Sequence, residues 1–224
     1  MQAVILAAGL GTRMGELTKD CPKPLLKIQD LTLLEHNLKS LPPEIDEVVL
    51  VVGYLAEKIK HQIGDEFLGK KIVYVQQKEL KGTGHALSMC KAALNGRFLV
   101  LMGDDLYEKD DLAELARHPL GILVLELDSD ELTSDRQALV KVDAQGRLLD
   151  IIERQPAHKG MLVNVGAYVL DKRYFDFPLA EAGNKTAEFG LPQTMLQMVK
   201  LGAQFDIVKA HWWHKVAGPD DLKI

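Results

Sequence analysis

Two short segments near the start of the chain contain residue types suited to phosphate chemistry. They are Leu6–Met14, which reads LAAGLGTRM, and Pro22–Pro24, which reads PKP. Glycine lets backbone N–H groups approach a phosphate closely and adopts positive φ without strain. Arg13 adds a planar set of donors for phosphate oxygens, and Lys23 adds a compact positive charge. Because each proline fixes its own φ, we expect Lys23 to lie on a stiff, extended segment. The pattern predicts a preorganised cationic site for a polyphosphate.

Other glycine-containing motifs fit less well. A dinucleotide-binding fingerprint needs a third glycine where Met14 stands. The stretch nearest to a kinase-type P-loop, Gly64–Lys71, lacks the final Ser or Thr. It also follows a predicted helix and precedes a predicted strand, which is the reverse of the P-loop order, so we predict a solvated turn there. A glycine turn that only reverses the chain would not need Thr12, Arg13 and the PKP segment.

Together, LAAGLGTRM and PKP make the sequence resemble the nucleotide-sugar pyrophosphorylases, also called sugar-1-phosphate nucleotidyltransferases. Further matches follow in the family's order along almost the whole chain. The resemblance implies an enzyme that transfers a nucleotidyl group from a nucleoside triphosphate to a sugar 1-phosphate and releases pyrophosphate. It implies catalytic roles for Arg13 and Lys23, which would hold and neutralise phosphates. It also implies that the nucleotide is bound by Leu6, Ala8, Gly9, Gly11, Thr12, Gln77, Gly82 and Thr83.

Asp104 and Asp105 follow the strongly apolar run Phe98–Met102. A carboxylate at the end of a parallel strand points into the ligand crevice of an open α/β sheet. Mg²⁺ takes oxygen ligands there and usually shares them with substrate phosphates. The resemblance implies that Asp104 is the metal ligand and a catalytic residue, with Mg²⁺ as the cofactor. An N-cap for the following helix is the alternative role, and Asp105 fits it better than Asp104.

Gln77 stands five residues before Gly82, which opens the run Gly82–Leu87, GTGHAL. In the similar enzymes a glutamine at this spacing and the following glycine recognise a pyrimidine base. A carboxamide offers both a donor and an acceptor, which match a uracil-like edge. Gln76 is the alternative ligand, because strand alternation lets only one of the two glutamines face the site. We therefore expect UTP or dTTP to be favoured over purine nucleotides.

Three residues resemble positions that contact the sugar in this family: Glu153, Asn164 and Glu188. Their side chains suit hydrogen bonding to hydroxyl groups. Two positions depart from the family pattern. Lys215 stands where the family commonly has an Asp that is a second metal ligand, and Ala138 stands where many members have Gly.

Lys215 leaves other functions open. A protonated lysine cannot ligate Mg²⁺, so one alternative is a non-catalytic regulatory module that binds nucleotide or sugar. The other is a nucleotidyltransferase with a non-sugar phosphorylated acceptor, against which the sugar-contacting residues argue. His211 and His214 stand close together in sequence, but two histidines without a third ligand are more often packing or surface residues.

Composition excludes several classes of protein. The 224 residues are 47% hydrophobic and 26% charged, typical of a globular domain, with a net charge of −5. That charge argues against a nucleic-acid-coating role. The sequence has no apolar run of membrane-spanning length, and we expect no signal peptide, because Met1 and Gln2 lead straight into a predicted strand. Cys21 and Cys90, the two cysteines, have no metal-binding spacing. We expect a cytoplasmic protein that does not bind membranes and that can form a homo-oligomer.

Strand-like and helix-like segments alternate, which predicts βαβ units and the α/β class. We expect a Rossmann-like αβα sandwich with a mixed, mostly parallel sheet in one domain. Its nucleotide-binding half would cover about 1–117 and its sugar-binding half about 118–224. The predicted strands are Gln2–Ala7, Glu47–Val52, Lys71–Gln76, Arg97–Met102, Gly121–Glu126, Ala138–Val142, Leu148–Ile152, Leu162–Leu170 and Gln204–Lys209. The predicted helices are Leu31–Leu41, Leu55–Ile63, Gly84–Leu94, Asp110–Arg117 and Phe189–Leu201.

Overall fold

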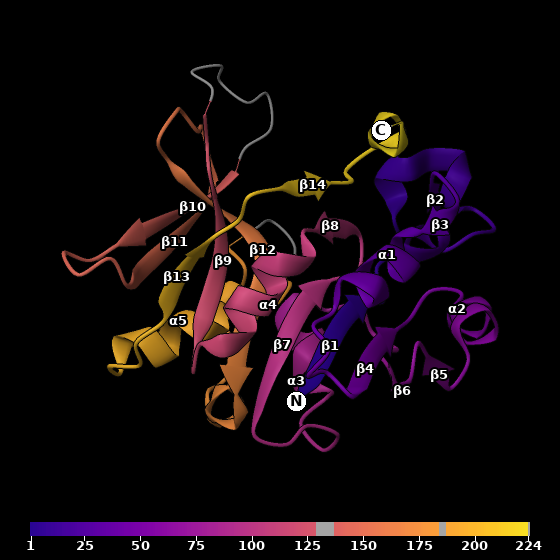
Figure 1. The fold of residues 1–224 in the computed structure, drawn as a ribbon, viewed down its shortest axis with the longest axis horizontal. Helices are drawn as coiled ribbons and strands as arrows, with labels where there is room; N and C mark the ends of the chain where they lie inside the picture. Colours follow the sequence, from indigo (N-terminus) through magenta and orange to yellow (C-terminus); the bar gives the residue numbers. More distant parts are fainter. Residues whose placement is uncertain (129–136, 184–186, 224) are drawn as a thin grey trace.

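The computed structural model describes residues 1–128, 137–183 and 187–223 and places one large sheet at the centre of the fold (Figure 1). The strand order is β11-β10-β12-β7-β1-β4-β6-β5, with β9 beside β12 and β13 beside β9. The ten strands are β1 (Gln2–Ala7), β4 (Glu47–Val52), β5 (Glu66–Phe67), β6 (Lys70–Gln76), β7 (Arg97–Met102), β9 (Gly121–Glu126), β10 (Gln137–Val142), β11 (Leu148–Gln155), β12 (Leu162–Asp171) and β13 (Asp206–Lys209). Two small sheets flank it: β2 (Lys27–Ile28) with β3 (Leu31–Thr32), and β8 (Asp105–Tyr107) with β14 (Trp213–Lys215).

Strand direction differs between the two halves of the sheet. β1 pairs in parallel with β4 and β7, and β4 pairs in parallel with β6, so the carboxyl ends of these strands meet at one edge. β12 then joins antiparallel to β7 and to β9, which makes one continuous sheet from both halves of the chain. The expected α/β class with a mixed sheet is confirmed. The parallel edge is where a ligand crevice forms in such sheets.

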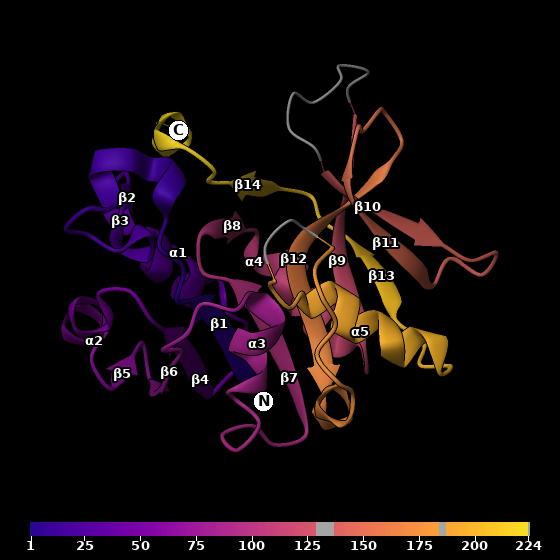
Figure 2. The same cartoon turned by 180° about the vertical axis from the view of Figure 1, so that it is seen from behind.

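Helices cover both faces of this sheet. α1 (Leu33–Ser40), α2 (Ala56–Ile63) and α4 (Lys109–Arg117) share one apolar cluster, whereas α3 (Thr83–Ser88) and α5 (Leu191–Lys200) share another. Figure 2 shows α3 and α5 on the near side of the sheet. Successive strand residues point to opposite faces, so Ile5 enters the first cluster and Val4 the second. The two cores fix the positions of the strand ends that carry the site.

The structure corrects the prediction for Lys23. The chain is extended at Pro22, with ψ 141, but Lys23–Leu25 forms a short 3₁₀ helix. Leu25 donates to the carbonyl of Pro22, and Leu26 donates to that of Lys23. Proline is compatible with a first helical turn because its missing N–H is not needed there. Three further 3₁₀ helices cover Thr12–Thr18, Lys172–Asp176 and Pro219–Leu222.

Three other predictions need correction. The helix expected over Gly84–Leu94 ends at Ser88, after which turns continue to Ala93. Asp105 does not cap a helix. It begins β8, and Glu108 caps α4 instead. The Gly64–Lys71 stretch contains the short strand β5 and the start of β6. Strands of two or three residues are too short to show a hydrophobic period, so the sequence pattern does not reveal them.

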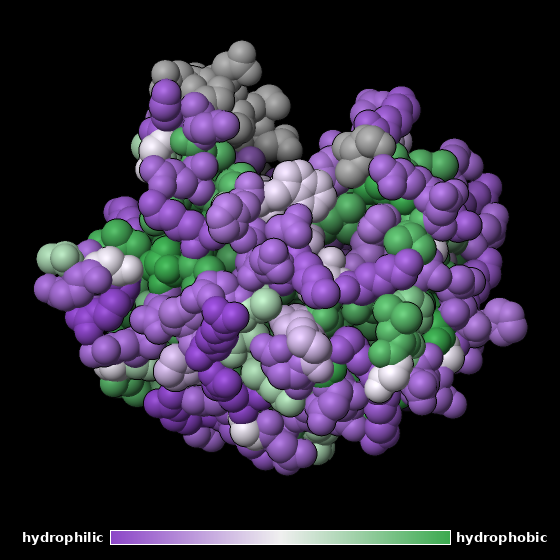
Figure 3. Space-filling model, viewed as in Figure 1, coloured by the Kyte–Doolittle hydropathy of each residue, from purple (hydrophilic) through white to green (hydrophobic). Residues whose placement is uncertain are grey.

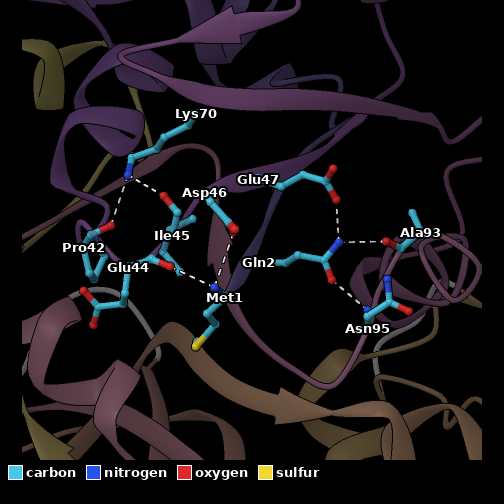
Figure 4. Close-up of polar contacts among 10 residues, drawn as sticks. All are labelled: Met1, Gln2, Pro42, Glu44, Ile45, Asp46, Glu47, Lys70, Ala93 and Asn95. Carbon is cyan, nitrogen blue, oxygen red and sulfur yellow. Dashed lines mark hydrogen bonds and ion pairs between the residues drawn. The ribbon is translucent and has the colours of Figure 1, made fainter.

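Polar contacts fix the opposite, amino-terminal ends of β1 and β4 (Figure 4). The Met1 ammonium group donates to the carbonyl of Glu44 at 2.8 Å. The Gln2 carboxamide donates to a Glu47 carboxylate oxygen at 2.6 Å and to the carbonyl of Ala93 at 2.9 Å. These contacts hold neighbouring strands in register far from the carboxyl-end cavities. In the parts of the chain that the structure describes, no helix is both long and apolar enough to cross a membrane.

Candidate nucleotidyl-transfer site

A cavity of about 560 Å³ opens at the carboxyl ends of β1 and β7. It brings together the predicted catalytic and nucleotide-binding residues from five separate stretches of sequence. Its lining includes Leu6, Ala8, Gly9, Gly11, Thr12, Arg13, Lys23, Gln77, Gly82, Thr83, Asp104 and Glu188. The surface of Figure 3 is mostly hydrophilic on the face shown, with hydrophobic residues in smaller patches between hydrophilic ones. A concave site with a few convergent polar groups is typical of a ligand pocket.

The loop after β1 is shaped by Gly11. This residue has φ 66, in the left-handed region, and precedes the 3₁₀ helix that begins at Thr12. A Cβ at Gly11 would lie 2.9 Å from the Lys23 Cβ and 3.0 Å from Thr18 Cγ2. The Thr18 hydroxyl donates to the Gly11 carbonyl at 3.0 Å. Only glycine combines this conformation with such close packing, so the loop and the Lys23 segment are positioned together.

Lys23 and Asp104 form the charged centre of this cavity. The Lys23 side chain is only 6% exposed, and its Nζ lies 2.6 Å from Asp104 Oδ2. The same Nζ donates to the carbonyl oxygen of Val216. An ammonium group has three N–H donors, so one donor remains for a ligand in the cavity. Arg13 is exposed and lines the same cavity, which places a second cation beside the loop.

A second cavity of about 310 Å³ adjoins the first, because Thr83, Met102 and Ala182 line both. Glu153 and Asn164 lie here. A Glu153 oxygen accepts from Gln193 at 3.3 Å, and Asn164 donates to the Tyr168 hydroxyl at 2.7 Å. These contacts fix polar side chains in positions suited to hydroxyl recognition. Asn164 also accepts from the backbone N–H of Gly166.

Glu188 is placed differently from the other two sugar-contact candidates. It lines the first cavity and not the second, so the structure does not bring it together with Glu153 and Asn164. The segment next to it packs on the nucleotide side, where the N–H of Phe189 donates to the carbonyl of Lys81 at 2.8 Å. A contact with the sugar therefore remains a prediction for Glu188.

Asp105 and Lys215 line the second cavity and lie opposite each other in the β8–β14 pair. The indole N–H of Trp213 donates to an Asp105 carboxylate oxygen at 3.3 Å. Burial raises the pKa of Asp105 well above the usual aspartate range, and the negative charge of Asp104 raises it further. Lys215 thus stands at the wall of the second cavity, at the register position opposite Asp105.

The two histidines near β14 do not form a metal site. The ring of His211 pairs with Asp111, whereas the ring of His214 contacts the carbonyl of Asp221. Across residues 1–128, 137–183 and 187–223, no group of three or more His, Cys, Asp or Glu side chains is arranged to hold a metal ion. The structure therefore gives no support to a histidine-based metal centre.

A family model described as "Nucleotidyl transferase" matches residues 2–222. The chain belongs to the nucleotidyl transferase family. Among curated relatives, a D-glycero-alpha-D-manno-heptose 1-phosphate guanylyltransferase of Campylobacter jejuni is 38% identical over 183 residues, covering 81% of each chain. A UTP–glucose-1-phosphate uridylyltransferase, AglF of Haloferax volcanii, is 28% identical over 99% of this chain and 93% of its own.

Longer relatives and solved structures extend the comparison. The bifunctional protein GlmU of Methanocaldococcus jannaschii is 29% identical over 99% of this chain, which spans about half of that relative (52%). The fold matches a putative glucose-1-phosphate thymidylyltransferase from Bacillus anthracis, in complex with a sucrose, at a TM-score of 0.82 and 20% identity, over 99% of this chain and 92% of that one. It also matches an inositol-1-phosphate CTP transferase from T. maritima at a TM-score of 0.75 and 21% identity, over 98% and 90%. Apart from GlmU, these similar proteins have different nucleotides in their names.

The donor set suits Mg²⁺ that is shared with a nucleotide. Asp104 is 38% exposed at the cavity wall, and Asp105 follows it directly. Mg²⁺ in nucleotide sites is usually held by one or two carboxylates together with substrate phosphates. Asp104 is the residue that would hold it here. Lys215 stands at the sequence position where the family resemblance implies a second acidic ligand.

Several features of this candidate site have no clear sequence signal. Leu10 and Leu80 line the first cavity, and they are 47% and 37% exposed although both are leucines. The Val216 carbonyl, which holds Lys23, lies 193 residues away in sequence. His85 contacts the predicted base-binding Gln77. Of these, only His85 could have been found, because it stands within the GTGHAL run.

Proposed function

We propose that this chain transfers a nucleotidyl group from a nucleoside triphosphate, with UTP or dTTP favoured, to a sugar 1-phosphate and releases pyrophosphate. The observation that carries the proposal is the adjacency of two cavities. One is lined by a glycine loop and the cations Arg13 and Lys23, and the other by Glu153 and Asn164. A nucleotide in the first and a phosphorylated sugar in the second would meet at their shared wall, near Asp104.

The reaction needs positioning more than acid–base chemistry. A phosphate oxygen of the acceptor is already ionised, so it attacks the α-phosphorus without a strong general base. A bond forms between that oxygen and the α-phosphorus, while the bond to the departing pyrophosphate breaks. Catalysis then depends on alignment and on neutralisation of negative charge.

Each residue of the centre has a role in this scheme. The loop amides and Arg13 bind the β and γ phosphates, because N–H donors and a guanidinium match phosphate oxygens. The third donor of Lys23 reaches the reacting phosphates and neutralises their charge. Asp104 would hold Mg²⁺ together with phosphate oxygens, and bound Mg²⁺ supplies further charge neutralisation.

The choice of base rests on Gln77. Its side chain is buried at the cavity wall, whereas Gln76 is exposed, so Gln77 is the glutamine that faces the site. Leu10 and Leu80 add apolar surface to the same cavity, on which a base could pack. The uridylyltransferase AglF supports UTP as donor, while the guanylyltransferase relative makes GTP the necessary comparison.

A pyrophosphate-release assay tests the proposal directly. UTP, dTTP, CTP, GTP and ATP are each combined with a panel of sugar 1-phosphates and with phosphorylated non-sugar alcohols. We expect release only when a sugar 1-phosphate is present, and fastest with UTP or dTTP. Release that requires a non-sugar acceptor would support the second transferase hypothesis. Nucleotide binding without release under any combination would support a regulatory binding module.

A further inference from the structure

Three contacts hold Gln77: one fixes its backbone and two hold its side-chain carboxamide. Its backbone N–H donates to the carbonyl of Val52 at 2.8 Å, which continues the β4–β6 pairing by one residue. Its Nε2 lies 3.2 Å from the carbonyl oxygen of Gly82 and 3.0 Å from His85 Nδ1. Gln77 is 4% exposed and lines the first cavity. A side chain with these contacts has little freedom to turn.

These contacts also determine which atom of the carboxamide is nitrogen. A backbone carbonyl oxygen such as that of Gly82 can only accept a hydrogen bond, so the atom facing it must be the NH₂ group. His85 Nδ1 lies against the same nitrogen and must then accept as well, which places the ring proton on Nε2. Both N–H donors of Gln77 are thereby used. Within the described residues, no donor contacts Gln77 Oε1.

The segment that carries His85 is itself rigid. Gly82 has φ 92, and a Cβ there would lie 2.4 Å from the carbonyl oxygen of Phe189. Gly84 donates to that same carbonyl at 2.8 Å, and Phe189 donates to the carbonyl of Lys81 at 2.8 Å. The first turn of α3 is therefore clamped between Gln77 and the Phe189 segment. His85 cannot follow Gln77 if the carboxamide turns over.

We propose that His85 is a positioning residue which leaves only the oxygen of Gln77 for the base, so that the site selects bases with a ring N–H group. The inference rests on the proposed function, in which this cavity takes the nucleotide. Uracil and thymine have an N–H at N3, and guanine and hypoxanthine have one at N1. Cytosine at N3 and adenine at N1 present a lone pair instead. A ring lone pair opposite Gln77 Oε1 would place two acceptors together and leave that oxygen unpaired, whereas a ring N–H would donate to it.

The proposal separates hydrogen bonding from ring size. Gln77 alone would accept guanine as well as uracil, and the dimensions of the cavity would distinguish purines from pyrimidines. Pairs of bases with the same ring size therefore test the inference. UTP and CTP form one pair, and ITP and ATP form the other. In each pair the first member has the ring N–H group and the second does not.

The experiment measures binding of the four nucleotides to the wild-type protein by calorimetry, and then measures turnover with a sugar 1-phosphate. We expect UTP to bind roughly 10–100-fold more tightly than CTP, the range for an unmade hydrogen bond at a buried group. If purine nucleotides bind, ITP should likewise bind more tightly than ATP. Equal affinity within whichever pair binds would overturn the proposal.

Two substitutions at the same position test His85 itself. His85→Leu removes the acceptor of one Gln77 N–H, which can then donate to a ring lone pair such as that of cytosine, so the UTP-to-CTP ratio should fall to about threefold or less. His85→Asn keeps an acceptor oxygen close to the position of Nδ1 and should retain most of the ratio. Thermal unfolding of both variants checks that they fold. A His85→Leu protein with the wild-type ratio would show that His85 does not position Gln77.

The outcomes separate this inference from the proposed function. Selective binding without nucleotidyl transfer would refute the transferase activity and leave base selection by Gln77 intact. Nucleotidyl transfer with equal affinity for the two members of a pair would refute base selection by Gln77 and leave the transferase activity intact. If none of the four nucleotides bound, both would be refuted.

Discussion

Replacing Lys23 should reduce turnover much more than it reduces nucleotide affinity. The Lys23 Nζ is buried between Asp104 Oδ2, at 2.6 Å, and the Val216 carbonyl, and its remaining donor is available to the reacting phosphates. Loss of one preorganised charge contact typically lowers kcat by about 10²–10³, or about 2.7–4 kcal/mol of transition-state stabilisation. The affinity loss should be smaller, because Arg13 and the loop amides still bind the β and γ phosphates.

Stability should also fall, by an amount that leaves the protein folded. Lys23→Ala leaves the Val216 carbonyl without its donor, and an unpaired buried polar group costs about 1–3 kcal/mol. Asp104 is 38% exposed, so water can solvate its carboxylate and no full charge penalty is added. For a chain of this size, about 1 kcal/mol shifts Tm by roughly 2–4 °C. Typical domain stabilities of about 5–15 kcal/mol exceed this loss.

The assay compares kcat, nucleotide Kd and Tm for three variants. Lys23→Ala removes the whole side chain, and Lys23→Met keeps a stem of similar length without the charge. Lys19→Ala is the matched control, because its 71% exposed side chain precedes the same segment and does not line the cavity. We expect both Lys23 variants to lose turnover and the control to keep it. Near wild-type turnover in Lys23→Met would refute the assigned role.

Three further predictions concern other parts of the site and its surroundings. Lys215→Asp should lower the Mg²⁺ concentration needed for half-maximal turnover, because a carboxylate that can ligate Mg²⁺ replaces an ammonium group that repels it. An unchanged Mg²⁺ titration would show that Lys215 does not act on the metal. Gly82→Ala should lower both Tm and nucleotide affinity, because the added Cβ would lie 2.4 Å from the carbonyl oxygen of Phe189. Gly146→Ala is the control: Gly146 also has a positive φ but lies in open space, so this substitution should lower Tm alone. A hydrogen bond from the Asp111 carboxylate raises the pKa of His211. The stabilisation from this pair is therefore complete below the unfolded-state histidine pKa of about 6.5, and it is lost as the pH rises through the raised pKa of the folded state. Wild type should therefore exceed His211→Gln in Tm by more at pH 5.5 than at pH 9, and an equal difference at both would contradict the assignment.

Residues near one another in sequence were the most predictable part of the site. The loop after β1 follows from its glycines, and the position of Asp104 follows from the apolar strand that precedes it. Strand alternation allows one of Gln76 and Gln77 to face the site, and the structure identifies Gln77. A local pattern thus predicts the loop and the place of Asp104, whereas for the two glutamines it only limits the choice to one of the pair.

Contacts between distant segments could not be predicted in the same way. The Lys23–Asp104 pair joins residues 81 apart, and β14 meets β8 more than 100 residues away. Neither strand of that pair is long enough to show a period, so Asp105 looked like a helix cap. The backbone contacts of Phe189 hold the neighbouring Glu188 at the first cavity, a placement that its position in the family order does not predict.

The charges around Asp104 explain why an anionic ligand would complete this site. Lys23 is already paired with Asp104, so that ion pair adds no net charge, while Arg13 and Lys215 line the two cavities. Burial and the neighbouring Asp104 raise the pKa of Asp105, which reduces its tendency to balance those cations. The two cavities are lined by four cations, Arg13, Lys23, Arg154 and Lys215, and by four carboxylates, Asp104, Asp105, Glu153 and Glu188, so this region does not share the net charge of −5 of the whole chain. A triphosphate would bring negative charge to Arg13 and to the remaining donor of Lys23, together with oxygen ligands for Mg²⁺, so nucleotide and metal should bind cooperatively, each raising the affinity for the other by the same factor.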